Sequence, residues 1–307
     1  MNDSLDYTVV VPVFNSKKTL NELFHRIKTT IDTMGKSFEV IFVEDCGQDE
    51  SWKTICQLKS QFPAHIVAIK LSRNFGQHNA IMCGFDHARG NFIITIDDDL
   101  QIPPEEIRKI VDVQQLNNSD LVYGVYEKKQ HHTMRNLGSQ IIQKIFQCVF
   151  KTTGDITSFR LISSSLVAKI KQHRQNFVFV DGLLHWYTSQ VDRVEIGHEP
   201  RRGGKSGYSA AKLIRLATNL LFNFTTLPLR IVVYLGLLIS VTSFLIGALF
   251  VFRKVIYDVP VGYTSIIVTL FFMSGIILLV MGVIGEYLSR LFSLQNNKPQ
   301  YSIKELI

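Results

Sequence analysis

The sequence has no glycine-rich loop of the kind that most often holds nucleotide phosphates. The residues P-V-F-N at 12–15 end the first predicted strand, where a G-x-G-x-x-G or Walker fingerprint would place its glycines. Both of those nucleotide-binding classes are therefore excluded. Cysteine is also scarce: the four cysteines show no C-x-x-C spacing, which argues against a zinc site and predicts reduced thiols in a cytosolic domain.

An apolar leader is missing as well, because residues 1–7 are polar and the first apolar run is a short strand. We therefore expect no signal peptide, and an N-terminal domain that stays in the cytosol. The net charge of +7 could attract nucleic acid, but the lipids of a membrane are a nearer anionic partner for a chain with the apolar runs described next. We expect no nucleic-acid partner.

Long apolar runs are abundant in the last third of the 307-residue chain. Residues 231–252 and 261–285 contain no charged side chain, and each run exceeds the roughly 20 residues needed to cross a bilayer. Buried core helices are a poor alternative because they are rarely apolar on every face. Lys and Arg precede the first run and follow the second, although Arg253 and Lys254 lie between them. We predict a multi-pass protein of the inner (cytoplasmic) membrane with both termini in the cytosol; paired spans favour a homo-oligomer, but the sequence leaves the oligomeric state open.

The N-terminal two thirds alternate between apolar strands and helices, which predicts an α/β domain with a mostly parallel sheet covered on both sides. The expected strands are 7–13, 38–43, 66–71, 93–96, 121–125 and 159–162. The expected helices are 16–34 with Ser16 as N-cap, a helix ending near 62 with Asp49 or Ser51 as N-cap, 79–88, and one beginning near Glu105. Apolar spacing in 209–227 predicts an interfacial helix leading into the membrane, with a core helix as the alternative.

Three carboxylates, Asp97, Asp98 and Asp99, follow the strand at 93–96, and two prolines then prevent the strand from continuing. Ligands of open α/β sheets bind at the carboxyl ends of strands, where these side chains are placed. Adjacent carboxylates repel one another, and a divalent cation relieves that repulsion. Asp97, Asp99 and Gln101 form an all-oxygen set that suits Mg²⁺ or Mn²⁺. A solvated acidic turn is the alternative.

Four strings together resemble glycosyltransferase family 2: V-P-V-F-N at 11–15, V-E-D at 43–45, L-S-R-N-F-G-Q at 71–77 and D-D-D-L-Q-I-P-P at 97–104. The last string is the most specific. The resemblance is to the polyprenyl-phosphate branch, which includes dolichol-phosphate mannose synthases and bacterial undecaprenyl-phosphate glucosyltransferases, and it runs from about residue 7 to 290. It implies a GT-A catalytic domain, a nucleotide-sugar donor and a polyprenyl phosphate acceptor.

The same resemblance implies roles for individual residues. The donor would be bound by Pro12, Asn15, Asp45, Asp97, Asp98, Arg202, Lys205 and Ser206. The metal would be held on the diphosphate by Asp97, Asp99 and Gln101, and Arg73 would be structural or would face the donor.

On the acceptor side, Arg135, Ser139 and Arg160 would bind the lipid phosphate. Arg135 and Ser139 are spaced i, i+4, which puts both on one helix face, although Arg135 could also be an ordinary surface cation. Asp155 and Asp99 are the predicted catalytic residues, and Asp155 would act as a base or would orient its neighbours. The chain departs from the family pattern at Glu44, Asp98 and Tyr126.

We therefore predict a membrane-anchored, metal-dependent, inverting glycosyltransferase of the cell envelope that moves a sugar from a nucleotide-sugar, UDP-glucose by preference, to undecaprenyl phosphate. The alternatives are a GDP-mannose-dependent enzyme and a non-catalytic nucleotide-sugar-binding scaffold. A processive polysaccharide synthase would carry a Q-x-x-R-W string, which is absent. The predicted organisation is a GT-A domain at 1–208, an amphipathic helix at 209–228, two spans at 229–290 and a cytosolic tail at 291–307.

Overall fold

The computed structural model describes residues 5–126, 156–173, 178–197, 199, 218, 225–257, 262–296 and 299–307. The chain forms two compact units. The first contains Met1–Leu137, Thr152–Gly207 and Lys298–Ile307, and the second contains Gly138–Lys151 and Tyr208–Asn297. The predicted interfacial helix at 209–228 lies almost wholly outside the described residues.

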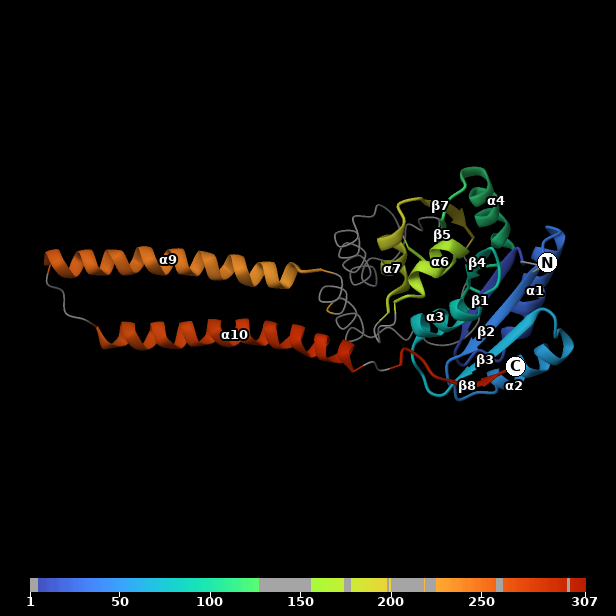
Figure 1. Ribbon diagram of the computed structural model, residues 1–307, viewed down its shortest axis with the longest axis horizontal. Coiled ribbons are helices and arrows are strands. Elements are labelled where there is room, and N and C mark those ends of the chain that lie inside the picture. The colour runs from blue at the N-terminus through green and yellow to red at the C-terminus, as the bar shows by residue number, and fades with distance from the viewer. Residues whose placement is uncertain are drawn as a thin grey trace. The chain divides into compact units, whose positions relative to one another are not determined.

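The first unit is built on one mixed sheet, to which eight strands of the described chain contribute (Figure 1). The strands are β1 (Tyr7–Val13), β2 (Phe38–Glu44), β3 (Ile66–Leu71), β4 (Phe92–Thr95), β5 (Leu121–Tyr126), β6 (Arg160–Ser163), β7 (Val191–Ile196) and β8 (Ile303–Leu306). Their order across the sheet is β7-β5-β6-β4-β1-β2-β3-β8. Strands β1 to β4 are parallel neighbours, whereas β6 and β8 run antiparallel to the strands beside them.

Helices cover both faces of this sheet, as the uninterrupted apolar strands require. The helices of this unit are α1 (Leu20–Thr33), α2 (Ser51–Gln61), α3 (Gln77–His87), the 3₁₀ turn η1 (Pro104–Glu106), α4 (Ile107–Asn117), α6 (Ser164–Ile170) and α7 (Val180–Tyr187). On one face Val9 and Val11 of β1 share a core with the apolar residues of α1, α2 and α4. On the other face Val10 lies against Gly84 of α3, so β1 is buried from both sides.

The helix starts differ from the predicted caps. Helix α1 begins at Leu20 with Thr19 as its N-cap residue, three residues later than the predicted cap Ser16. Ser16 instead uses its backbone carbonyl to accept a hydrogen bond from the Thr19 hydroxyl at 3.0 Å. Asp49 does accept a hydrogen bond from the Ser51 N–H at the start of α2.

Strand β8 was not predicted from the sequence. Residues 303–306 lie beyond the two apolar runs, yet they pair with β3 and cover what would otherwise be the edge of the sheet. The pairing places Leu71 opposite Ile303 and Lys70 opposite Glu305. The segment predicted as a tail therefore contains a strand of the catalytic domain's sheet.

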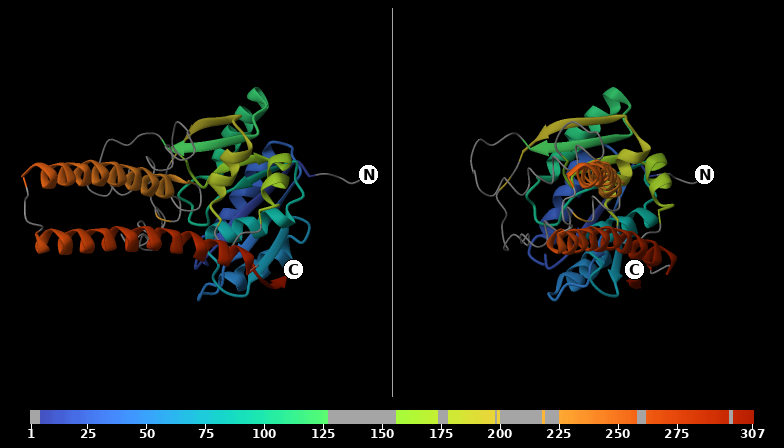
Figure 2. Two further views of the ribbon diagram at one scale, coloured as in Figure 1. Left: turned by 60° about the vertical axis from the view of Figure 1, so that its left-hand side comes forward. Right: turned by 90° about the vertical axis from the view of Figure 1, so that its left-hand side faces the viewer.

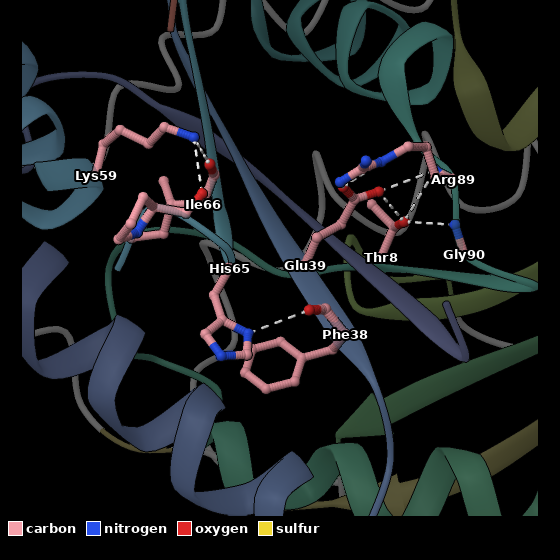
Figure 3. Close-up of polar contacts among 9 residues, drawn as sticks. Thr8, Phe38, Glu39, Lys59, His65, Ile66, Arg89 and Gly90 are labelled. Atoms are coloured by element: carbon pink, nitrogen blue, oxygen red, sulfur yellow. Dashed lines mark hydrogen bonds and ion pairs between the residues drawn. The ribbon is translucent and has the colours of Figure 1, made fainter. Parts of the chain in front are cut away.

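At the amino ends of the strands, a buried carboxylate joins three segments (Figure 3). Glu39 of β2 accepts a 2.9 Å hydrogen bond from Arg89 Nε and one of 2.8 Å from the Thr8 hydroxyl of β1. Thr8 in turn accepts from the Gly90 N–H. A Cβ on Gly90 would lie 2.5 Å from the backbone nitrogen of Thr8, so only glycine fits there. These contacts fix the turn that leads into β4.

The second unit contains two long helices, α9 (Leu227–Tyr257) and α10 (Tyr263–Gln295), which run side by side in Figures 1 and 2. Leu227–Leu249 and Phe272–Ser289 are long and apolar enough to cross a membrane, and neither window is buried. The described helices coincide broadly with the two predicted spans.

Candidate active site

A pocket of about 280 Å³ lies at the carboxyl ends of β1, β2 and β4, where the sequence placed the ligand site. Four segments form it: the end of β1, Asp45 directly after β2, the acidic residues after β4, and the loop between β3 and α3. The residues lining it are Pro12, Val13, Phe14, Asp45, Asn74, Gly76, Gln77, Asp97, Asp98 and Asp99. Four of the predicted donor-binding residues, Pro12, Asp45, Asp97 and Asp98, are thus brought together with the predicted metal ligand Asp99.

Asp45 holds the loop between β3 and α3. Its two carboxylate oxygens accept hydrogen bonds from the backbone N–H groups of Phe75 at 2.7 Å and Gly76 at 2.8 Å. Burial raises the pKa of Asp45, and these two hydrogen bonds oppose that shift. Gly76 has φ of +89° and ψ of 154°, a conformation that is almost restricted to glycine. Asp45 of the V-E-D string and Gly76 of the R-N-F-G-Q string therefore act together to shape the pocket.

Asp98, the middle carboxylate, ties the acidic turn to the loop after β1. Its side chain accepts from the Phe14 N–H at 2.9 Å, and its backbone carbonyl accepts from the Thr19 hydroxyl at 2.5 Å. Burial raises the pKa of Asp98 to about 7; the hydrogen bonds from Ser16 and Phe14 oppose this, and the charges of Asp97 and Asp99 reinforce it. Asp98 therefore holds the acidic turn in place.

Asp97 and Asp99 are oriented by neutral donors. Asp97 accepts from the side-chain amide of Gln77 at 2.7 Å and from the hydroxyl of Ser158 at 2.5 Å. Asp99 accepts from the Gln101 N–H at 3.1 Å, across a turn in which Leu100 has φ of +57°. These donors help to fix the directions of both carboxylates.

This arrangement fits a hard divalent cation. Each carboxylate has about four lone-pair sites, so the observed hydrogen bonds leave room for further ligation. Within the described ranges, no group of three or more His, Cys, Asp and Glu side chains is arranged to hold a metal. A site with two carboxylates is what Mg²⁺ uses when substrate phosphates and water fill its other positions.

Arg160 is not at the pocket, contrary to the acceptor role predicted for it. Its side chain is 1% exposed, forms an ion pair with Asp181 of α7 and donates from Nε to the Thr95 hydroxyl at 3.1 Å. The Tyr123 hydroxyl also donates to Asp181, at 3.0 Å. A guanidinium buried in this way cannot reach a lipid phosphate; it locks β6 to β4, and it thereby places Ser158 beside Asp97.

Comparison with known proteins identifies the family. Residues 8–171 match the family described as Glycosyl transferase family 2. The undecaprenyl-phosphate 4-deoxy-4-formamido-L-arabinose transferase of Enterobacter sp. (strain 638) is 31% identical over 305 residues, which cover 98% of this chain and 93% of that protein. The chain belongs to glycosyl transferase family 2.

Solved structures agree with this family at the level of the fold. The glucosyl-3-phosphoglycerate synthase from Mycobacterium tuberculosis in complex with UDP matches with a TM-score of 0.52 at 14% identity, covering 71% of this chain and 78% of that one. Its complex with Mn²⁺ and UDP-glucose gives a TM-score of 0.51 at 13% identity, covering 71% and 77%. The first unit is therefore a GT-A-like domain, as predicted.

Two residues predicted from the family resemblance, Asn15 and Gln101, are not among the residues that line the pocket. Asn15 has φ of +57° and lies next to the pocket, where its side-chain oxygen accepts from the Gln48 N–H at 2.7 Å. Gln101 lies beside the pocket and accepts, through its carbonyl, from the Glu199 N–H. The following residues lie outside the described part of the chain, and their roles stay predictions: Arg135, Ser139, Asp155, Arg202, Lys205 and Ser206.

Sequence reasoning assigned no role to two donors, Gln77 and Ser158, although both orient Asp97. Gln77 was part of a quoted family string, and that string could have identified it. Ser158 gave no local signal, because its partner lies 61 residues away. Tyr126 also belongs to this region, since burial and then the charges of Asp97 and Asp99 raise its pKa to about 12.

Proposed function

We propose that the protein is a membrane-attached, metal-dependent glycosyltransferase that transfers a sugar from a UDP-sugar to undecaprenyl phosphate. The observation that carries this proposal is the likeness to the Enterobacter transferase, which extends across the catalytic domain and both apolar helices. That relative is named for an undecaprenyl-phosphate acceptor. The acidic pocket at the carboxyl ends of β1, β2 and β4 supports the proposal, because it would be the matching donor site.

On the donor side, Asp97 and Asp99 would hold Mg²⁺ or Mn²⁺, with Gln101 as the third predicted ligand. When bound, the cation would neutralise charge on the donor diphosphate as the bond to the sugar breaks. Gln77 and Ser158 orient Asp97, so the carboxylate is held ready rather than ordered by each substrate. Asp45 keeps the adjoining loop in the conformation that lines the nucleotide pocket.

On the acceptor side, the lipid phosphate is already an anion at neutral pH and can attack the anomeric carbon without a strong base. The requirement is to bring two polyanions together, which cations accomplish. Arg135 and Ser139 are the proposed acceptor-phosphate pair, and Arg202, Lys205 and Ser206 the proposed donor-phosphate loop. Asp155 would orient the acceptor or take a proton. Attack from the face opposite the nucleotide would invert the anomeric centre.

The membrane arrangement proposed here is two spans with the catalytic domain in the cytosol. Strand β8 follows α10 and pairs with β3, so the helical segment leaves one sheet and returns to it. An even number of crossings satisfies that connection. The catalytic domain would then work at the inner face of the cytoplasmic membrane, where the phosphate of its lipid acceptor lies.

The identity of the transferred sugar is the most specific part of the proposal. We infer a UDP-sugar donor, and UDP-glucose is the first to test. UDP-4-deoxy-4-formamido-L-arabinose is tested beside it, since the relative is named for that sugar. GDP-mannose is the alternative from the other nucleotide class.

The test is a transfer assay with purified full-length protein, undecaprenyl phosphate and Mn²⁺ or Mg²⁺. The radiolabelled donors are UDP-glucose, UDP-GlcNAc, UDP-4-deoxy-4-formamido-L-arabinose and GDP-mannose, with Asp99→Ala as the control. The expected result is organic-extractable label from one UDP-sugar that requires the metal and is lost in the variant. Tight binding of UDP without a lipid-linked product from any donor would favour a non-catalytic scaffold, and label from GDP-mannose alone would contradict the donor class.

A further inference from the structure

Residues 299–307 follow both apolar helices in the sequence, yet they form part of the sheet beside the pocket. Strand β8 runs antiparallel to β3, and backbone hydrogen bonds join Ala68 and Ile307 in both directions at 2.9 and 3.0 Å. The indole N–H of Trp52 in α2 donates to Glu305 at 3.2 Å. Strand β8 is therefore held along its length by backbone and side-chain contacts.

Residues 72–76 form a loop of the pocket between β3 and α3, which we call the donor loop. Residues 299–307 contact both β3 and α3. At the start of the loop, the Ser72 N–H donates to the carbonyl of Ser302 at 2.8 Å. Beyond its end, the hydroxyl of Tyr301 donates to the carboxylate of Asp86 on α3, the helix into which the loop leads. Two successive residues of the chain therefore connect the strand before the donor loop to the helix after it.

The donor loop both lines the pocket and is held by hydrogen bonds to Asp45. Asn74 and Gly76 of this loop line the pocket. The backbone N–H groups of Phe75 and Gly76 donate hydrogen bonds to the carboxylate of Asp45. Gly76 has positive φ, so the loop follows a path that a relaxed chain seldom takes. Holding such a path requires that both ends be fixed, because a freed segment regains conformational entropy.

We propose that Tyr301 and Ser302 are positioning residues for the nucleotide pocket, acting through the donor loop; this rests on the proposed function. They fix the distance between the end of β3 and α3, and so keep the Phe75 and Gly76 N–H groups aimed at Asp45. Loss of the Tyr301 hydroxyl leaves the pocket residues in place but lets the loop populate other conformations. The affinity for the nucleotide-sugar donor is then reduced in proportion to the fraction of molecules whose loop has the binding-competent conformation.

A role limited to covering the edge of β3 predicts something different. In that case every contact of β8 would contribute to stability alone, and the contact of Glu305 with Trp52 would matter as much as that of Tyr301 with Asp86. Glu305 meets α2, which does not flank the donor loop, so Glu305→Ala is the matched control for Tyr301→Phe.

The experiment compares the full-length wild type, Tyr301→Phe and Glu305→Ala in detergent or nanodiscs. We measure the Kd for UDP and for GDP with Mn²⁺ by calorimetry, the donor KM, acceptor KM and kcat of the transfer reaction, the Tm, and amide hydrogen exchange at Phe75 and Gly76. If a tenth to a third of Tyr301→Phe molecules keep the competent loop, its nucleotide Kd and donor KM rise about 3- to 10-fold. Its kcat and acceptor KM stay within twofold, and its two amides exchange faster.

Glu305→Ala is expected to lower the Tm while its donor KM and the exchange of the two amides stay as in the wild type. Equal Kd, KM and exchange rates in Tyr301→Phe and wild type would overturn the inference, and so would the same effects in both variants. Hydrogen exchange needs no substrate, so it decides the inference even if the wild type transfers no sugar and the proposed function fails.

Discussion

The amino ends and the carboxyl ends of the strands hold carboxylates with different hydrogen-bond donors. At the amino ends of the strands, Glu39 is 0% exposed and accepts hydrogen bonds from the Arg89 guanidinium, the Thr8 hydroxyl and the Arg89 backbone N–H. At the carboxyl ends, Asp97 and Asp98 receive hydrogen bonds from an amide, a hydroxyl and a backbone N–H. At the amino ends of the strands, a carboxylate is paired with an arginine of the protein. At the carboxyl ends, these hydrogen bonds to the carboxylates come from neutral donors.

This difference separates stability from function within one sheet. A carboxylate joined to an arginine has its charge satisfied in the folded state, and it contributes to the cohesion of the domain. The neighbouring carboxylates after β4 repel one another, and a bound divalent cation would relieve that repulsion. Five substitutions can break or sharpen this comparison.

The largest effect is expected at the metal carboxylates. Asp99→Asn keeps an oxygen to accept from the Gln101 N–H but removes a charge, so transfer activity should fall by at least about 100-fold. The Tm should stay level or rise, because repulsion among neighbouring carboxylates is relieved. The radiolabel assay and a thermal melt measure the two, and chelation of the metal with EDTA should abolish wild-type activity reversibly. A variant that is as active as the wild type would remove Asp99 from the site.

At the amino ends of the strands, Arg89→Met should show the reverse pattern. It leaves the Glu39 carboxylate buried without its cation, at a cost of about 2–3 kcal/mol and hence a Tm lower by roughly 4–12 °C. Activity per folded molecule should not change. The control is Lys36→Met, which removes an exposed ion pair with Asp6 and should cost no more than about 1 kcal/mol. Equal melting temperatures for the two variants would contradict the structural role of Arg89.

One glycine at each end of the strands offers a finer comparison. Gly90→Ala places a Cβ against the backbone of β1 and should cost about 1–3 kcal/mol of stability without changing nucleotide affinity. Gly76→Ala meets no atom within 4 Å, but its positive φ strains any other residue. Its main effect should be a weaker Kd for UDP, because the Gly76 N–H moves away from Asp45. Denaturant titration and calorimetry should give opposite rankings of the two variants.

The smallest effect is expected from the hydroxyl that orients Asp97. Ser158→Ala should lower the apparent affinity for Mn²⁺ by about 10-fold, the lower end for partners that orient a metal ligand. Saturating Mn²⁺ should restore most of the activity. Thr157→Val, which removes a neighbouring hydroxyl bonded to the Gly124 carbonyl, serves as the control and should leave the metal titration unchanged.

Local patterns predicted the part of the fold that carries the acidic site. Each of the strands β1 to β4 is one mostly apolar stretch of the sequence, and the acidic string follows β4. The strand, the turn and the predicted ligands could therefore be recognised together. Arg160 was misplaced because an arginine ordinarily indicates the surface, whereas its burial depends on Asp181, which only the fold brings near. Strand β8 was missed for a similar reason. Its four residues are unremarkable alone, and their partner β3 lies on the other side of both apolar helices in the sequence.

The position of β8 in the chain also has a consequence for biosynthesis. The ribosome makes β3 early and β8 only after α9 and α10, so the edge of β3 stays open while both apolar helices are synthesised. At about 5–20 residues per second, that interval is roughly 10 to 50 seconds. A nascent chain therefore carries an uncovered strand edge until both apolar helices have been synthesised. The sheet is completed only after both long apolar helices have been made.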